Sequence, residues 1–229
     1  MKDTVIFLGH LGLGDHIIQQ GIVNRLAMQY GYVLIFCKHH NLKSVRHMCR
    51  SNVDIIPVSG DIEVNQIYPQ IEDIDIVSVG LYNKNWESFD ADKIAFDKYF
   101  YQQAKMDFEV SYEVEFDAPV LIDNNIMKLS FNKPFCFIHD DKDRGFEIDM
   151  NRIHTDLTIV RPSIRAEKIF DYIPLIQKAA EIHCVDSSFA LMIDRANIKC
   201  DKKYIHRYVR SDSHNPSYKD DWNIICPDK

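Results

Sequence analysis

Polar and glycine residues gather in one short segment near the N-terminus, residues 9–16, which reads GHLGLGDH. An apolar run at residues 5–8 precedes this segment, and apolar residues with helical spacing follow it. Asp15 is a candidate general base, because a carboxylate in such a loop can take a proton from an incoming hydroxyl group. Glycines here let a ligand approach the backbone. We therefore predict that Asp15 is catalytic. The acceptor, the molecule that carries this hydroxyl group, is predicted to contact His10, Gly12, Gly14 and His16.

Asp15 has a second interpretation, because aspartate is a favoured N-cap and the residue could serve the helix alone. A position at a helix N-terminus is expected to lower its pKa and keep it ionised at neutral pH. The glycines at 9, 12 and 14 have the spacing G-x-x-G-x-G, which is not the dinucleotide-binding fingerprint, and no G-K-[ST] follows as in a phosphate-binding P-loop.

Two further polar segments follow apolar runs in the second half of the chain. One segment is Asp186-Ser187-Ser188, at the start of a predicted helix. Its hydroxyl groups and free backbone N–H groups can hold a diphosphate, although Asp and Ser are also common helix N-caps. In the loop at residues 139–145, Arg144 is the side chain best suited to grip a phosphate. We predict that a bound diphosphate is contacted by His139, Arg144, Asp186, Ser187 and Ser188.

A cluster of aspartates in the same loop raises the question of a metal ion. Asp140, Asp141 and Asp143 together could bind a divalent cation, but such a pattern is more often solvated surface. The six cysteines are scattered and form no C-x-x-C pair, which favours reduced thiols over disulfides or zinc ligands. We therefore predict no metal and no cofactor.

The pattern of apolar runs and glycine-bearing loops predicts two α/β halves. In the first half we expect parallel strands at 5–8, 32–36, 53–58 and 74–79, with helices near 15–30, 40–50 and 90–108. In the second half we expect strands at 135–139, 157–160, 182–185 and 203–209, a helix at 164–180 broken near Pro174, and a helix at 189–196. The fold class is α/β with two Rossmann-like domains, residues 1–128 and 129–229, facing a central cleft.

Composition limits the classes of function. Hydrophobic residues make up 46% of the 229 residues, enough for a core, and the net charge is −7. An acidic chain lacks the basic face that a general nucleic-acid binder needs. No apolar run approaches the roughly 20 residues of a transmembrane helix, and the N-terminus shows no signal-peptide pattern. We expect a cytoplasmic protein without a membrane span; the oligomeric state stays open.

The two loop motifs together resemble those of a known family. The stretch from Gly12 to Ile17 resembles the G-D loop of heptosyltransferases of lipopolysaccharide synthesis, and residues 182–189 resemble that family's strand followed by D-T-G. The sequence departs from the family pattern at Gly21, where a proline is common, and at Ser187 and Ser188, which replace threonine and glycine. The resemblance implies the two-domain GT-B fold, an aspartate base at Asp15, a donor diphosphate against residues 186–188, and usually no metal.

These observations lead to one main function and two alternatives. The main hypothesis is an inverting glycosyltransferase that moves a sugar from a nucleotide-diphosphate sugar to a glycan or other hydroxyl acceptor. A non-catalytic nucleotide- or sugar-binding module, in which Asp15 and Asp186 only cap helices, is the first alternative. An NAD-dependent enzyme is the second; the glycine spacing and Lys38-His39-His40, where a ribose-binding acid should follow the second strand, count against it.

Overall fold

The computed structural model describes residues 3–114, 133–162, 166–209 and 215–226, apart from the side chain of Asp143. The chain forms two compact units. One comprises residues 1–114 with 214–217, and the other comprises residues 115–213 with 218–229. The predicted boundary at residue 128 lies outside the described residues. Within those residues, no helix has the length and apolar character needed to cross a membrane.

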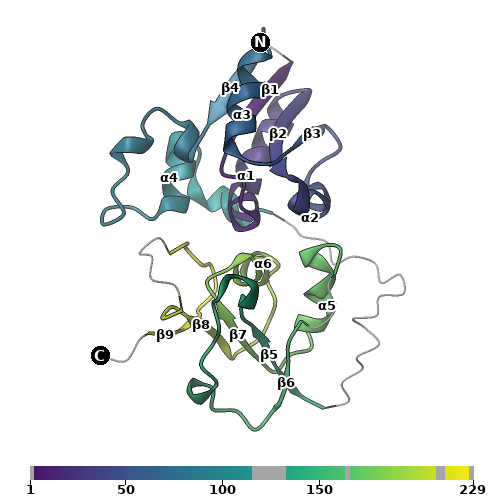
Figure 1. Ribbon diagram of the computed structural model, residues 1–229, viewed down its shortest axis with the longest axis vertical. Helices are drawn as coiled ribbons and strands as arrows, with labels where there is room; N and C mark the ends of the chain where they lie inside the picture. The colour runs from purple at the N-terminus through teal and green to yellow at the C-terminus, as the bar shows by residue number, and fades with distance from the viewer. Residues whose placement is uncertain (1–2, 115–132, 163–165, 210–214, 227–229) are drawn as a thin grey trace. The chain divides into compact units, whose positions relative to one another are not determined.

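The first unit is built on a four-stranded parallel sheet with the order β3-β2-β1-β4 (Figure 1). The strands are β1 (Thr4–Leu8), β2 (Tyr32–Lys38), β3 (Val53–Val58) and β4 (Asp75–Ser78). The helices are α1 (Leu13–Gln29), α2 (Leu42–Met48), α3 (Asp61–Ile67) and α4 (Phe96–Gln103). The predicted parallel series is confirmed, but the helix expected at 90–108 is limited to α4.

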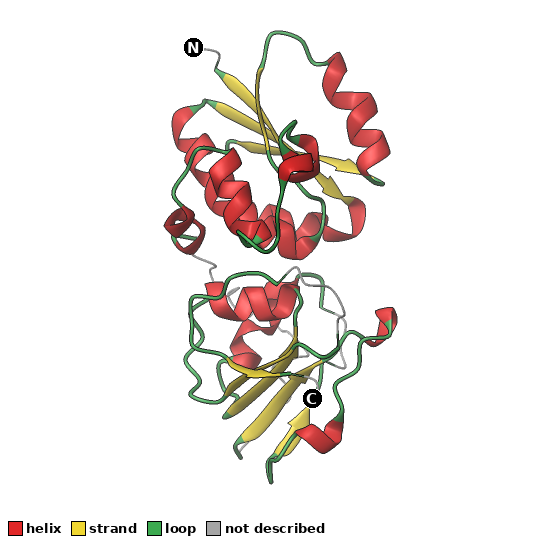
Figure 2. Ribbon diagram, turned by 90° about the vertical axis from the view of Figure 1, so that its left-hand side faces the viewer, coloured by secondary structure: helices red, strands yellow, loops and turns green. Residues whose placement is uncertain are grey.

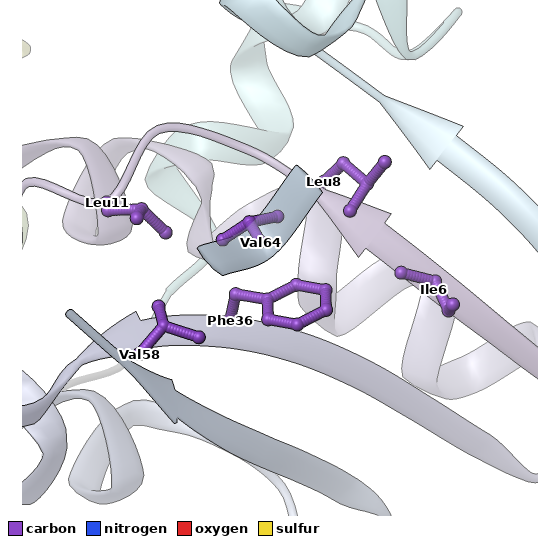
Figure 3. Packing of buried hydrophobic residues seen from close by; sticks show 6 residues of the cluster. All are labelled: Ile6, Leu8, Leu11, Phe36, Val58 and Val64. Atoms are coloured by element: carbon purple, nitrogen blue, oxygen red, sulfur yellow. The ribbon is translucent and has the colours of Figure 1, made fainter. Parts of the chain in front are cut away.

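The core of the first unit is apolar on both faces of the sheet, as expected for a sheet with helices packed against it. One cluster joins β1, β2, β3 and α3 and is drawn in Figure 3; its members are Ile6, Leu8, Leu11, Phe36, Val58 and Val64. α1 is buried over most of its length, including the polar residues His16, Gln19 and Gln20. Its close packing depends on Gly21, where a Cβ would meet the Val110 carbonyl oxygen at 2.4 Å.

The second unit has its own five-stranded parallel sheet with the order β6-β5-β7-β8-β9 (strands labelled in Figure 1). Figure 2 distinguishes the strands, in yellow, from the helices, in red. The strands are β5 (Phe135–His139), β6 (Thr158–Val160), β7 (Glu181–Val185), β8 (Lys203–His206) and β9 (Asn223–Ile225). The α-helices are α5 (Ile173–Ile176) and α6 (Ser188–Arg195). Of the helix expected at 164–180 with a break near Pro174, the described residues form a 3-10 helix (Ile169–Tyr172) that leads into α5; Pro174 stands in the first turn of α5, where the missing N–H does no harm.

The two faces of the second sheet differ in character. On one face Phe137 and His139 stack against Phe189 of α6. On the other face Cys136 and Ile138 pack with residues of a loop, Ile148 and Ile153. Because side chains alternate along a strand, residues 181 and 183 of β7 share this second face with Cys136, in line with the pairing of Cys136 and Glu181.

Residues 219–222 of the C-terminal tail are held to α6 by hydrogen bonds. Asp194 of α6 accepts hydrogen bonds from the backbone N–H groups of Lys219 and Asp220, each at 3.0 Å, and from Trp222 Nε1 at 3.2 Å. These bonds place the tail so that β9 can extend the sheet. Strand β9 was not predicted, because a three-residue apolar segment in a polar tail carries little periodic signal.

Candidate functional site

The loop at residues 9–12 lies at the carboxyl end of β1, where the strand order of the first sheet reverses. β2 and β3 extend the sheet on one side of β1, and β4 pairs on the other. In open parallel sheets, ligands bind at such a switch point. The sequence therefore places Asp15 and its neighbouring glycines beside a position where this type of fold commonly binds ligands.

Asp15 is the third residue of α1, and the N-cap is Gly12, so the N-cap interpretation of Asp15 is wrong. Its carboxylate turns back over the loop and accepts a hydrogen bond from the Gly12 backbone. Burial raises the pKa of Asp15 to about 6. This hydrogen bond and the positive charge of Lys38 lower the pKa, but by less than burial raises it. The expectation of a lowered pKa is therefore wrong as well, because desolvation outweighs the helix terminus.

Lys38 is a neighbour of Asp15 that sequence reasoning did not assign to the site. It is the last residue of β2, and its positive charge acts on Asp15. The carboxyl ends of β1 and β2 are adjacent in the parallel sheet, which explains the approach. The available signal was the position itself, since Lys38 ends a strand that neighbours β1.

His10 is held by the turn after β4. Its Nε2 accepts a hydrogen bond from the Leu81 backbone N–H at 3.0 Å, and its ring lies edge-on to Trp86 and Phe100. Gly80 has φ +60°, and a Cβ there would lie 2.1 Å from His10 Nε2, so glycine is required. Burial lowers the pKa of His10 to about 4. A neutral ring with Nε2 engaged is a poor replacement for Asp15 as base.

His16 and Gln19 are buried polar residues on α1 beside the loop. Burial lowers the pKa of His16 to about 4. Within the part of the chain that the structure describes, His16 Nε2 and both polar atoms of Gln19 have no hydrogen-bond partner. Gln19 packs so tightly against Gly9 that a Cβ there would meet Gln19 Oε1 at 2.2 Å. Buried polar atoms without partners each cost about 1–3 kcal/mol, and three such atoms lie in the first two turns of α1, which follow the candidate acceptor loop.

The second unit has its own switch point, between β5 and β7. His139 ends β5, and Ser187 follows β7 as the N-cap of α6. Ser187 Oγ and His139 Nδ1 lie 3.4 Å apart, so the fold brings together two predicted contacts that are 48 residues apart in the chain. Ser187 makes no side-chain cap hydrogen bond to the helix. Its hydroxyl and the first N–H groups of α6 together can receive an anion.

Asp186 does not cap α6. One of its carboxylate oxygens accepts a hydrogen bond from Tyr218 Oη at 2.8 Å, and the other lies 3.7 Å from Arg207 Nε. The capping interpretation is therefore wrong for Asp186. These contacts join the end of β7 to the residue after β8 and to the C-terminal tail, links that no local sequence pattern could reveal.

Arg144 lies in a short 3-10 turn after β5 and is largely exposed. Its guanidinium group donates to Asp141 Oδ2 through Nε at 2.6 Å and also through Nη2. In the same loop, Asp140 Oδ2 lies 3.4 Å from Arg161 Nε. Two aspartates of the suspected metal cluster are thus paired with arginines, which favours an ion-pair role for both.

Two parallel α/β units, each with polar side chains at its switch point, define the architecture. A family 9 glycosyl transferase from Veillonella parvula has a similar structure: the TM-score is 0.56 at 8% sequence identity, covering 98% of this chain and 85% of that one. The iron-containing dodecameric glycosyltransferase TibC from enterotoxigenic E. coli gives a TM-score of 0.54 at 11% identity, covering 90% of this chain and 59% of TibC. The sequence matches no family model and no curated protein. At such identities the likeness establishes the fold, which is the fold of these glycosyltransferase structures.

Proposed function

We propose that the protein is a glycosyltransferase that moves a sugar from a nucleotide-diphosphate sugar to a hydroxyl group of a glycan or other acceptor. The observation that carries this proposal is Asp15, a carboxylate with a pKa of about 6 at the switch point of the first sheet. Such a group is ionised at neutral pH and is a stronger base than an ordinary aspartate. The fold and the paired His139 and Ser187 support the same assignment.

The reaction is a single displacement with inversion. Asp15 takes the proton of the acceptor hydroxyl while the hydroxyl oxygen forms a bond to the anomeric carbon of the donor sugar. The bond from that carbon to the diphosphate breaks, and the nucleoside diphosphate leaves with the electron pair. The first unit binds the acceptor beside residues 9–16, and the second unit binds the donor.

The charge of the departing diphosphate needs stabilising groups. In this proposal they are the hydroxyls of Ser187 and Ser188, the first N–H groups of α6, and Arg144 after release from Asp141. His139 is proposed to contact the donor beside Ser187; its stacking on Phe189, with ring centroids 3.7 Å apart, supports this by fixing the ring. No metal is assigned to the transfer, and a cytoplasmic location is part of the proposal.

A thermal-shift screen with UDP, ADP, GDP and CDP tests donor binding directly. A nucleoside diphosphate at 100 times its dissociation constant should stabilise the protein by about 2.7 kcal/mol. The matching nucleotide sugars are then tested for release of nucleoside diphosphate that depends on added acceptor. If none of the four diphosphates stabilises the protein, the donor assignment is wrong.

The non-catalytic module remains the second candidate, supported by the structural ties of Asp186 to Tyr218 and Arg207. It gives a different result in the same experiment. Such a module binds a nucleotide or sugar and is stabilised by it, but releases no nucleoside diphosphate with any acceptor.

A further inference from the structure

A second group of chemically active side chains lies on the face of the second sheet that α6 does not cover. Cys136 projects from β5, and Glu181 and His183 project from β7. The thiol sulfur, a carboxylate oxygen and an imidazole nitrogen all lie within 4.8 Å of one another, and all three residues are buried. The sugar-transfer mechanism proposed above uses none of these three residues.

We propose that Cys136, Glu181 and His183 bind a divalent metal ion of the zinc class. Sulfur, imidazole nitrogen and carboxylate oxygen are the donor set that zinc takes in proteins. His183 Nε2 and Glu181 Oε1 lie 2.8 Å apart in a hydrogen bond, and an ion bound by both atoms would replace this contact. Small side-chain shifts would bring the three donors to bonding distance of one ion, leaving a fourth position for water or another ligand.

The groups behind these ligands match what metal sites require. His183 Nδ1 lies 2.8 Å from His206 Nε2, and His206 Nδ1 lies 3.1 Å from Tyr208 Oη. Thr155 Oγ1 donates to Glu181 Oε2 at 3.2 Å, which leaves Oε1 toward His183. Hydrogen bonds to the far side of a ligating imidazole and carboxylate fix their orientation and strengthen binding.

A pocket provides the entry path that a metal site needs. Its volume is about 420 Å³, and Glu181 and His183 form part of its wall together with Arg152 and His154. The pocket reaches the carboxylate and the imidazole, while Cys136 lies among apolar side chains of the core. The fourth position of the ion would therefore face the pocket.

Binding the ion changes protonation in a defined way. Burial, with the nearby charge of Glu181, raises the pKa of Cys136 to about 12, so the metal-free residue is a thiol. The metal–sulfur bond replaces the S–H bond, and that proton is released. Burial lowers the pKa of His183, so the ring is neutral. When Nε2 of His183 binds the ion, both His183 and His206 remain neutral and carry their proton on Nδ1. His183 Nδ1 then donates to His206 Nε2, and His206 Nδ1 donates to Tyr208 Oη.

Cobalt(II) is the probe, because a thiolate bound to it gives a sulfur-to-metal charge-transfer absorption. The purified, metal-depleted full chain is titrated with Co²⁺, and we expect this absorption to saturate at one equivalent and to be abolished by excess Zn²⁺. Cys136→Ser should lose the absorption, and His183→Gln should weaken Co²⁺ binding at least tenfold. Cys184→Ser is the matched control, because Cys184 follows His183 on the opposite face; it should keep the full signal.

Circular dichroism and thermal unfolding show whether each variant is folded. A folded wild-type protein without the absorption, or the same absorption in a folded Cys136→Ser variant, would overturn the proposal. If Cys136→Ser does not fold, His183→Gln decides: unchanged Co²⁺ affinity in that variant is incompatible with the site. The outcome is independent of sugar transfer, since the readout is the bound metal.

Discussion

The carboxylate of Asp15 lies directly over Gly12: a Cβ built on Gly12 would come within 2.5 Å of Asp15 Oδ2. A side chain at position 12 would therefore push the carboxylate away from the loop. The same closeness allows the hydrogen bond from the Gly12 backbone, which partly offsets the cost of burying the charge. The glycine thus positions the proposed base as well as leaving room for a ligand.

Asp15→Asn tests the catalytic role. The amide keeps the size of the carboxylate but cannot take a proton, so kcat should fall by roughly 10²- to 10⁴-fold while donor binding persists. In the wild type, kcat/KM should decline as the pH drops below about 6, where Asp15 becomes protonated. Steady-state kinetics check both, with Asp54→Asn on the exposed part of β3 as control. A folded, fully active Asp15→Asn enzyme would exclude this base.

The same variant should be more stable than the wild type at neutral and higher pH. The folded-state pKa of Asp15, about 6, lies above its ordinary value of 3.8, so folding favours the protonated form. The protonated Asp15 side chain therefore stabilises the folded state fully below pH 3.8, and this stabilisation is lost as the pH rises through about 6. We expect Asp15→Asn to gain about 1–3 kcal/mol at pH ~8 and little at pH ~4. Urea unfolding of both proteins at the two pH values measures the free energy of unfolding. If the variant and the wild type differ by the same amount at both pH values, the desolvation argument is contradicted.

Donor binding should depend on Ser187 and Arg144. Ser187→Ala removes a hydroxyl at the start of α6, and Arg144→Ala removes the arginine of the loop that follows β5. Each should raise the donor KM roughly ten- to a hundredfold, because a charge-assisted hydrogen bond contributes about 1.5–3 kcal/mol. Ser51→Ala, at an exposed turn of the first unit, is the control. Unchanged donor affinity in both variants would move the donor site elsewhere.

Gly21→Ala should destabilise the first unit. The new Cβ would meet the Val110 carbonyl oxygen at 2.4 Å and Tyr101 Oη at 2.6 Å, and the latter group already donates to the Ile18 carbonyl oxygen at 2.7 Å. We expect a loss of about 1–3 kcal/mol from overpacking, although alanine favours a helix. Gly60→Ala is the matched control, since nothing lies within 4 Å of a Cβ there. Thermal unfolding of the two variants distinguishes steric clash from a general effect of glycine replacement.

The sequence by itself determined the two parallel α/β halves, and it located Asp15, His139 and Ser187 at strand ends. Apolar runs, glycine stops and helical spacing are local signals, and the parallel arrangement then places the strand ends together at one edge of each sheet. Irregular segments were less predictable: a 3-10 helix and the short α5 stand where a longer, broken helix was expected, and β9 depends on hydrogen bonds that the tail donates to Asp194.

Only the tertiary structure decided the electrostatics and the long-range pairs. The pKa of Asp15 rises because the surrounding fold removes water from the carboxylate. The position of Asp15 in its helix does not reveal this desolvation. Likewise the bond of Asp186 to Tyr218 and the approach of Cys136 to His183 join residues far apart in the chain. Local patterns predict which residues form strands and loops; burial and contact between strands depend on the complete packing, and these set the chemistry.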